Sequence, residues 1–278
     1  MVRERYEELQ AKEGRRCPYI VHVHLAAAKL PSRAALVAAL RASCGRVDPM
    51  GSEDDFLAFA YPDHMTTFAE GVRVPAQHIF TLLDDDAAAD MLEPALQQTW
   101  EWSGARDAVH GARATLLMND MMASGVDPHA RLDLFQRALR ATLPLLPAVA
   151  IHWLPSQRIV EPGAYLRADP DLGRVSSGPV NVRLFRVEGR EPGECIMDTL
   201  GMAAFDLPDL QCHFIGLDPG RIAARLYGYA TYVFAKGDII ADGNTVEGLE
   251  PGRRWVCRHE ASLAEPRRVV VDMNPGRA

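Results

Sequence analysis

Eight polar residues in the second half of the chain have side chains that could bind a ligand or catalyse a reaction. They are Asp198, Asp209, Gln211, His213, Asp242, Asn244, His259 and Glu260. They stand among stretches that otherwise favour apolar strands and turns. A buried polar group without a partner costs roughly 1–3 kcal/mol, so these residues either pair fully with one another or line a cleft. We expect a structural network, with a functional cleft as the alternative.

The histidines and cysteines offer two arrangements that could bind zinc, and neither is complete. His22 and His24 alternate on one strand face, but no Cys, Asp or Glu stands close to them in the sequence, which favours a half-buried strand. On a strand, Cys257 and His259 share a face, whereas the Cys-His pair at 212–213 takes opposite faces. We therefore expect no metal and no cofactor.

The motifs of common catalytic sites are missing from the sequence. Residues 259–263 begin like an HExxH zinc-protease helix, but Leu263 stands where the second histidine is required. No GxSxG, Walker A or GxGxxG motif occurs. Cys195 lies three residues before Asp198, and a carboxylate raises the pKa of a thiol rather than activating it. We expect Cys195 to be a small buried thiol.

A short acidic loop resembles a calcium site in part. Asp238, Asp242 and Asn244 supply oxygen ligands, but the closing glutamate and the alternating acids of an EF-hand are missing. Gly243 follows Asp242, and Asp-Gly is a common hairpin-turn sequence. The pattern favours a turn.

Composition limits the class of protein. The chain has 278 residues, of which 48% are hydrophobic and 24% charged, as in an ordinary soluble globular protein. Its net charge is −7 and neither half is basic, which argues against binding to nucleic acid or to a membrane surface. Five cysteines without a CxxC pair, and no signal-like or membrane-spanning run, predict a cytoplasmic protein.

The first half of the chain alternates strand-like and helix-like segments. Ser32 and Asp127 are expected to cap helices, and Pro62 is expected to end a strand. The apolar positions Leu132, Phe135, Leu139 and Leu143 predict one buried helix stripe. Strands are predicted at 19–25, 56–61, 72–83, 114–118 and 149–154, and helices at 34–43, 87–102 and 128–143.

This order predicts an α+β fold with two α/β-sandwich-like domains. Two successive β-helix-β units in the first domain are consistent with a diverged ferredoxin-like duplication, although the two copies share patterning and hardly any identities. The predicted organisation is an N-terminal tail (1–17), an N-terminal α+β domain (18–166), a loop-rich linker (167–179) and a C-terminal α+β domain (180–278).

In the second domain, residues 180–187 alternate as a strand does, and a helix capped by Asp218 is predicted from Pro219 to about Phe234. Two extended runs, 255–259 and 267–272, are placed to pair. We expect Trp255 to anchor the core of this domain.

Several motifs of the second half occur in a characteristic order. They read MDTLG at 197–201, LPDLQCHF at 207–214, GDII and DGNTV at 237–246, WxCxHExSL at 255–263 and PxRVVVDxNPG at 266–276. This succession resembles a bacterial family of uncharacterised proteins that share a C-terminal domain of unknown function. The resemblance covers roughly residues 180–276 and implies no established activity.

The missing catalytic motifs and the negative charge predict a non-catalytic binding protein with a protein partner. An immunity or accessory protein of a bacterial toxin system would fit, because the acidic residues Asp84–Asp86 and the loop with Glu188, Glu191 and Glu194 could meet a basic surface. The alternative is a hydrolase or a metal-dependent enzyme that uses His213, His259, Glu260 and Asp198.

Overall fold

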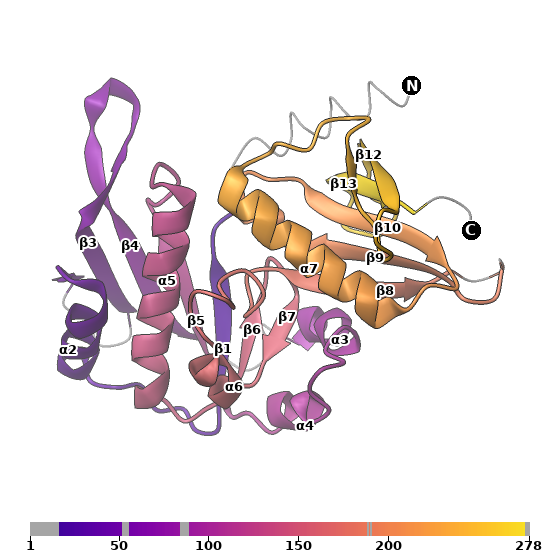
Figure 1. Ribbon diagram of the computed structural model, residues 1–278. Helices are drawn as coiled ribbons and strands as arrows, with labels where there is room; N and C mark the ends of the chain where they lie inside the picture. The colour runs from indigo at the N-terminus through magenta and orange to yellow at the C-terminus, as the bar shows by residue number, and fades with distance from the viewer. Residues whose placement is uncertain (1–16, 52–55, 84–88, 188, 190, 276–278) are drawn as a thin grey trace. The chain divides into compact units, whose positions relative to one another are not determined.

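The computed structural model describes residues 17–51, 56–83, 89–187, 189 and 191–275. Within these residues the chain forms helices and two β-sheets (Figure 1), so the predicted α+β class is confirmed. The chain divides after Gly178 into two compact units, of which the first is Pro18–Gly178 and the second includes Pro179–Ala278. Each unit contains one of the sheets and is described separately.

Most of the segment that the composition suggests as a linker packs within the first unit. Val175 is buried, and the Ser156 hydroxyl donates a hydrogen bond to the carbonyl of Gly178 at 2.6 Å. Gly178 has a φ of 146°, and a Cβ atom there would collide with the Trp153 indole. Residues 167–178 are therefore part of the first unit.

The sheet of the first unit has seven strands in the described residues, in the order β2-β3-β4-β5-β1-β6-β7. All of the neighbouring strands whose pairing is described run antiparallel. The strands are β1 (Ile20–Leu25), β2 (Asp48–Met50), β3 (Phe56–Thr67), β4 (Arg73–Leu83), β5 (Ala114–Met121), β6 (Ala148–Trp153) and β7 (Arg158–Val160).

Pro62 does not end the second predicted strand. Strand β3 continues to Thr67, and its pairing with β4 shifts register between Tyr61 and Met65. Proline has no N–H to donate to the ladder, and a bulge of this kind accommodates it without ending the strand.

The helices of the first unit are α2 (Arg33–Cys44), α3 (Ala89–Gln97), α4 (Ala105–His110), α5 (Pro128–Thr142) and α6 (Pro162–Arg167). The predicted caps are confirmed: Ser32 accepts a hydrogen bond from Ala35 N, and Asp127 accepts from two backbone amides of α5. The helix predicted at 87–102 is confirmed as α3 but is shorter than predicted, since it ends at Gln97. A second short helix, α4, which was not predicted, begins after Gly104, a residue that disfavours a helix interior.

The sheet does not repeat one β-helix-β unit. Strands β5 and β6 are parallel and β1 lies between them, which makes β5-α5-β6 a split unit of the predicted kind. The pairings place β3 antiparallel to β1, so the two halves of this unit differ in topology.

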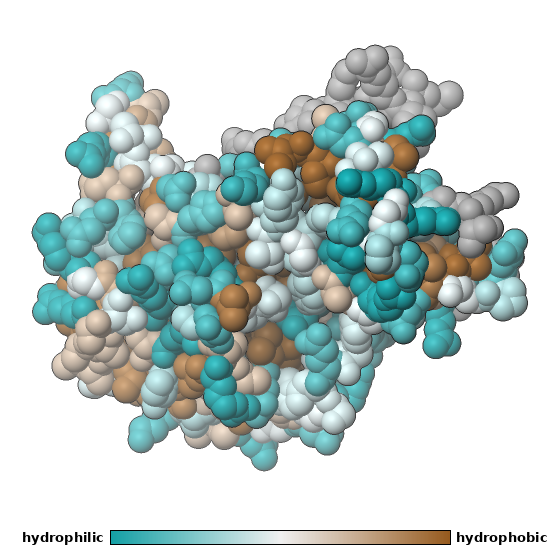
Figure 2. Space-filling view, viewed as in Figure 1, coloured by the Kyte–Doolittle hydropathy of each residue, from teal (hydrophilic) through white to brown (hydrophobic). Residues whose placement is uncertain are grey.

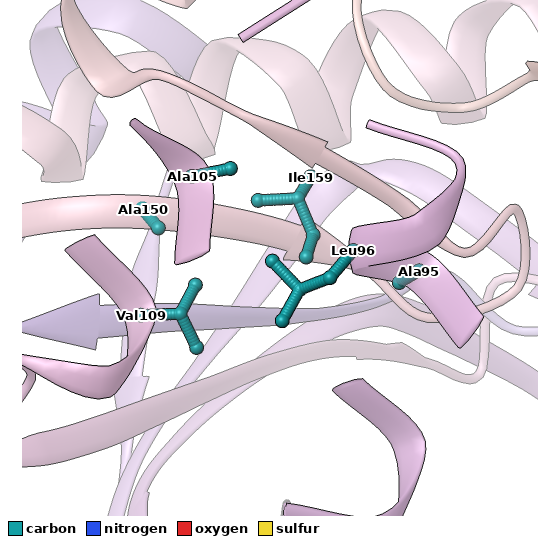
Figure 3. Packing of buried hydrophobic residues seen from close by; sticks show 6 residues of the cluster. All are labelled: Ala95, Leu96, Ala105, Val109, Ala150 and Ile159. Carbon is teal, nitrogen blue, oxygen red and sulfur yellow. The ribbon is translucent and has the colours of Figure 1, made fainter. Parts of the chain in front are cut away.

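Helices cover the two faces of this sheet unequally. The stripe predicted on α5 is confirmed, because Leu132, Phe135, Leu139 and Leu143 are all buried, and α5 packs against α2. Next to β6 and β7, the short helices α3 and α4 supply a smaller cluster (Figure 3). Its buried members are Ala95, Leu96, Ala105, Val109, Ala150 and Ile159.

The sheet of the second unit has six strands in the described residues, in the order β11-β12-β13-β10-β9-β8. Strands β10 and β13 pair in parallel, and the other described pairs are antiparallel. The strands are β8 (Asn181–Arg186), β9 (Glu194–Leu200), β10 (Asp209–Ile215), β11 (Thr245–Glu247), β12 (Arg254–Ala261) and β13 (Val269–Asn274). The predicted pairing of the two late runs is confirmed by β12 and β13.

One helix, α7 (Pro219–Lys236), packs against β8, β9 and β10 (Figure 1). Asp218 caps it by accepting a hydrogen bond from Arg221 N, as predicted. Side chains alternate along β10, so Leu210 and Cys212 share the apolar face while Gln211 and His213 point to the other. The apolar requirement of the helix-covered face therefore sends the polar side chains to the opposite face.

Trp255 on β12 is 2% exposed, which confirms that it belongs to the core of the second unit. We expect Trp255→Ala to lower the free energy of unfolding by about 3–5 kcal/mol, since it removes a large buried side chain and leaves a cavity. Chemical denaturation monitored by circular dichroism measures this change. Tyr232→Ala on α7 is the control, because Tyr232 is 48% exposed. Similar losses for the two variants would contradict the assignment.

Candidate functional site

The eight polar residues predicted from the sequence fall into three groups in the second unit. Asp198 and Asp209 belong to a buried ionic network, and Asp242, Asn244 and His259 belong to a turn. His213 and Glu260 line a groove, and the buried Gln211 lies beside Glu260. The structure therefore does not bring the eight residues into one network or one cleft.

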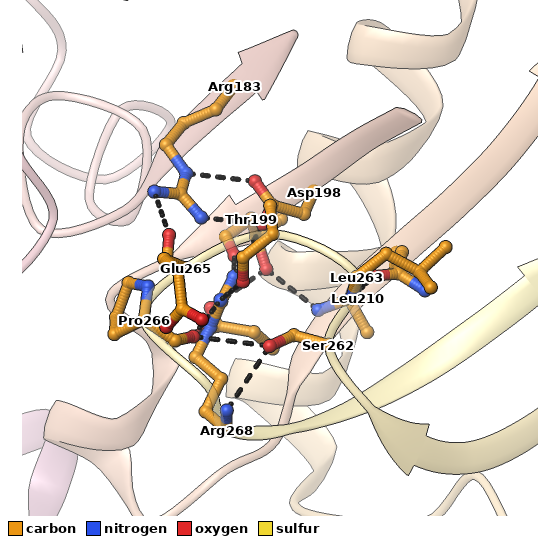
Figure 4. A network of polar contacts seen from close by, with 12 residues as sticks. Arg183, Asp198, Thr199, Leu210, Ser262, Leu263, Glu265, Pro266 and Arg268 are labelled. Carbon is orange, nitrogen blue, oxygen red and sulfur yellow. Dashed lines mark hydrogen bonds and ion pairs between the residues drawn. The ribbon is translucent and has the colours of Figure 1, made fainter. Parts of the chain in front are cut away.

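The first group is neutralised by two arginines (Figure 4). Arg183 binds both carboxylate oxygens of Asp198, with Nε–Oδ1 2.9 Å and Nη2–Oδ2 2.6 Å. Arg268 joins the two acids, since its Nη2 donates to Asp198 Oδ2 and its Nε donates to Asp209 Oδ2, both at 2.7 Å. The four side chains are at most 7% exposed.

Neutral groups complete this network. The Thr199 hydroxyl donates to Asp209 Oδ1 at 2.9 Å and accepts from Leu210 N at 2.8 Å. Arg268 also donates to the carbonyls of Thr199 and Pro266. Burial lowers the pKa of Arg268, but the two carboxylates outweigh it and raise that pKa above its ordinary value. Burial raises the pKa of Asp209, although Arg268 opposes this change. Each of the four charges is thus paired within a buried network.

The arginines of this network were not among the residues singled out from the sequence. A signal existed for Arg183, because the alternation along residues 181–186 puts it on the face opposite Val182 and Leu184. Arg268 approaches Asp198 across 70 positions of the chain. No spacing rule connects residues that far apart, so only the tertiary structure reveals this pair.

The second group forms a turn. Asp242 Oδ1 accepts hydrogen bonds from His259 N at 2.7 Å and from His259 Nδ1 at 2.9 Å. The backbone amide and then the imidazole of His259 hold the pKa of Asp242 below its ordinary value. Asn244 Oδ1 accepts from Ala241 N, and Gly243 has a φ of 82°. These contacts are those of a turn, the interpretation favoured from the sequence.

The third group lies on the polar face of the sheet. His213 Nε2 is 2.8 Å from Glu194 Oε1. The Gln211 amide nitrogen lies 3.3 Å from both Glu260 Oε1 and Asp272 Oδ1, and its oxygen accepts a hydrogen bond from Leu263 N. Glu194 and Asp272 are members of this group that sequence reasoning did not assign to it.

The surroundings of Glu260 and Asp272 disfavour ionisation of their carboxyl groups. Burial raises the pKa of Glu260, and the nearby Asp272 raises it further. Burial also raises the pKa of Asp272, although the hydrogen bond from Gln211 opposes this change. The nearby His213 and Arg258 oppose the shift in pKa of both carboxyls without cancelling it. Among the described residues, neither carboxyl forms an ion pair. A positive charge from outside the protein would therefore favour both carboxylates.

The third group opens into a groove of about 1430 Å³. Acidic side chains predominate over basic ones in its lining, and apolar side chains form part of the walls. The acids are Glu191, Glu194, Asp218, Glu250, Glu260 and Asp272, the bases are His213, Arg221 and Arg253, and the apolar residues include Phe214, Ile215, Leu217, Leu249, Trp255 and Leu263.

The cysteines of this unit are not suited to catalysis. Cys195, Cys212 and Cys257 are free and buried, as predicted for Cys195. Burial raises the pKa of Cys212 to about 12 and that of Cys257 to about 11, so both stay protonated thiols at neutral pH. Among the described residues, no three His, Cys, Asp or Glu side chains are arranged to hold a metal ion.

The outward-facing acids predicted from the sequence are only partly described. Asp84–Asp86 and Glu188 lie outside the described residues. Glu194 is 5% exposed, so the prediction that it faces outward is wrong. Glu191 lines the groove. In the space-filling view, hydrophilic and hydrophobic residues are interspersed over the visible side of each unit (Figure 2).

Residues 198–274 match a family described as "Domain of unknown function (DUF4261)", which agrees with the resemblance noted from the motifs. This match begins at Asp198 and includes the groove residues on β10, β12 and β13. No curated protein and no solved structure matches the chain. Among the described helices, none combines the length and the apolar character needed to cross a bilayer.

The buried ionic network predicts a large effect of removing Arg268. We expect Arg268→Ala to cost about 3–5 kcal/mol of unfolding free energy, because it leaves two buried carboxylates without their shared partner. The exposed pair Arg221–Glu250 provides the control. Arg221→Ala should change stability by less than about 1 kcal/mol in the same urea titration. Equal effects would show that the network is not needed for stability.

For the two carboxyls of the groove we expect a neutral substitution to raise the stability of the protein at neutral pH, whereas Arg268→Ala lowers it. Because their pKa values are raised on folding, they stabilise the folded state least at pH values above those pKa values. Glu260→Gln should therefore stabilise the protein at pH 7, by less than about 1 kcal/mol since the side chain is partly exposed. The gain should vanish as the pH falls towards 4, where the wild-type carboxyl is protonated. Thermal melts at both pH values test this, and destabilisation at pH 7 would contradict it.

Proposed function

We propose that this protein is a non-catalytic binding protein whose second unit receives a positively charged group of a protein partner in the groove. The observation that carries the proposal is the contrast between two sets of acids on one sheet. Asp198 and Asp209 share two arginines. Glu260 and Asp272 share the Gln211 amide and form no ion pair among the described residues, although Arg258 and His213 lie near enough to oppose part of their shift in pKa.

This contrast supports binding because partly buried carboxylates that are only partly compensated are costly for a protein to keep. A lysine or arginine of a partner would offset the desolvation of both carboxylates, because its positive charge is attracted by the negative potential of the groove. The arrangement is less stable without its ligand, and such a cost is typical of functional sites.

The walls of the groove support a protein rather than a small ion as the partner. Ile215 is 42% exposed and Leu263 is 50% exposed, and both border the groove. Apolar side chains of a partner could pack there while its charged group reaches Asp272 and Glu260. A mixed surface of this kind, with an apolar part and charges that fix orientation, is typical of protein interfaces.

The class of partner follows from the charge. A chain with a net charge of −7 attracts basic surfaces over a distance and repels acidic ones. We propose a basic protein of the bacterial cytoplasm, for which a toxin with a basic face, held by this chain as an immunity or accessory protein, is an example. The five free cysteines fit a reducing compartment.

Co-purification with variant proteins tests the proposal. Wild-type protein carrying an affinity tag should retain a basic partner from the native strain at low salt. The double variant Glu260→Gln, Asp272→Asn should bind that partner at least about tenfold more weakly, and 0.5 M NaCl should weaken the wild-type complex.

Glu247→Gln is the matched control, because Glu247 lies outside the groove lining and its side chain is 56% exposed. It should bind as the wild type does. Recovery of the wild type alone, or equal binding by the double variant, would contradict the proposal.

One contact supports a second candidate function, acid–base catalysis. Glu194 is buried and hydrogen-bonded to the partly exposed His213, an arrangement that orients an imidazole as a general base, and two carboxyls with raised pKa values lie near it. We expect His213→Gln to leave partner binding within about threefold of wild type. In the catalytic alternative, it would instead abolish turnover in a screen of ester and glycoside substrates.

A further inference from the structure

Three histidines form a buried cluster in the first unit, far from the groove residues in the sequence. His22 and His152 face each other across the β1–β6 pair, and His24 lies two positions further along β1. Their ring centroids are 6.2–6.5 Å apart. The three residues are at most 5% exposed.

The cluster contains polar atoms that nothing described satisfies. Three imidazole nitrogens have no hydrogen-bond partner among the described residues, namely both nitrogens of His152 and the Nε2 atom of His24. His24 Nδ1 is 3.2 Å from the Thr115 hydroxyl. Burial lowers the pKa of all three histidines, to about 4 for His24 and about 3 for His152. The cluster is therefore neutral at pH 7.

If the three histidines were protonated, no charged side chain described on the surrounding strands and helices would neutralise them. Strand β5 contributes Thr115, and the inward residues of α3, α4 and β7 are apolar. Arg158 on β7 pairs with Glu101. The charged side chains described on the two helices are exposed, namely Glu93, Arg106, Asp107 and His110.

The layer over this face is the weaker of the two helical layers. Helices α3 and α4 have 9 and 6 residues, and three of the six residues in their cluster with the sheet are alanines (Figure 3). On the opposite face, α2 and α5 have 12 and 15 residues. Short helices with little buried apolar area are the parts of a protein that open first.

We propose that the His22–His24–His152 cluster is a proton-operated latch, which in mildly acidic solution releases the α3–α4 layer from the sheet while α2 and α5 stay packed. Protonated imidazoles at these separations repel one another and require water, which only the open form supplies. The open form binds protons near the ordinary histidine pKa of about 6.5. Lowering the pH from 7 to 5 then favours opening by about 25-fold for each imidazole that becomes exposed.

Hydrogen exchange of the full chain, measured by mass spectrometry and corrected for the intrinsic pH dependence, tests the latch. Between pH 7 and pH 5, protection of peptides from residues 89–110 should fall by about 25-fold or more, and at pH 5 these residues should be clearly less protected than α5. Equal protection of both layers at pH 5 would mean that the unit unfolds as a whole, and no loss over residues 89–110 would mean that the cluster does not respond; either result overturns the proposal.

Two substitutions separate this cluster from burial of histidine in general. His152→Leu should reduce the pH response of residues 89–110 by about 25-fold, and His24→Leu serves the same purpose if that variant does not fold. His78→Leu is the matched control. His78 is 2% exposed with a pKa lowered to about 3 by burial, but it contacts Tyr61 and Phe135 under α5. An unchanged response in the cluster variants, or a lost response in the control, would overturn the proposal.

Discussion

The bidentate binding of Asp198 by Arg183, and the bridge that Arg268 makes from Asp198 to Asp209, hold the second unit together. These contacts connect β8, β9 and β10 to the segment that enters β13. Strand β13 is the one that pairs in parallel with β10. A parallel neighbour cannot be placed by a tight turn. The two arginines, together with the carbonyls that they bind, provide the side-chain contacts that fix the returning chain at this position.

This arrangement also explains why the groove keeps unbalanced charge. Arg183 and Arg268 are committed to the two sealed aspartates and to backbone carbonyls. The carboxyls at the other end of the same face share the Gln211 amide and form no ion pair among the described residues, and the nearby Arg258 and His213 compensate them only in part. One sheet face thus combines a neutral, rigid end with an acidic, open end. The buried end fixes the strands that carry the groove residues, and the open end is where the proposed partner would bind.

The first unit contains two kinds of buried polar group, a paired acid and a cluster of neutral histidines. Asp120 is fully paired, since Arg131 binds both of its oxygens at 2.6 and 3.1 Å. The three clustered histidines are instead kept neutral by burial. Paired charges stabilise over a wide range of pH, whereas neutral imidazoles do so only while they remain unprotonated. The histidines lie three together on the α3–α4 face, whereas His78 is the buried histidine described under α5, so we expect the α3–α4 face to be the more sensitive to acid.

The sequence by itself determined the elements and the class of fold. Period-two and period-3.6 patterns, with caps at Ser32, Asp127 and Asp218, predicted most strands and helices because they depend on neighbours a few positions away. Only the tertiary structure decided which polar residues meet. Arg268 finds Asp198, and His152 finds His22, across long stretches of chain. Strand order and register set those contacts, and no local pattern encodes them; for the same reason the eight polar residues separated into a network, a turn and a groove.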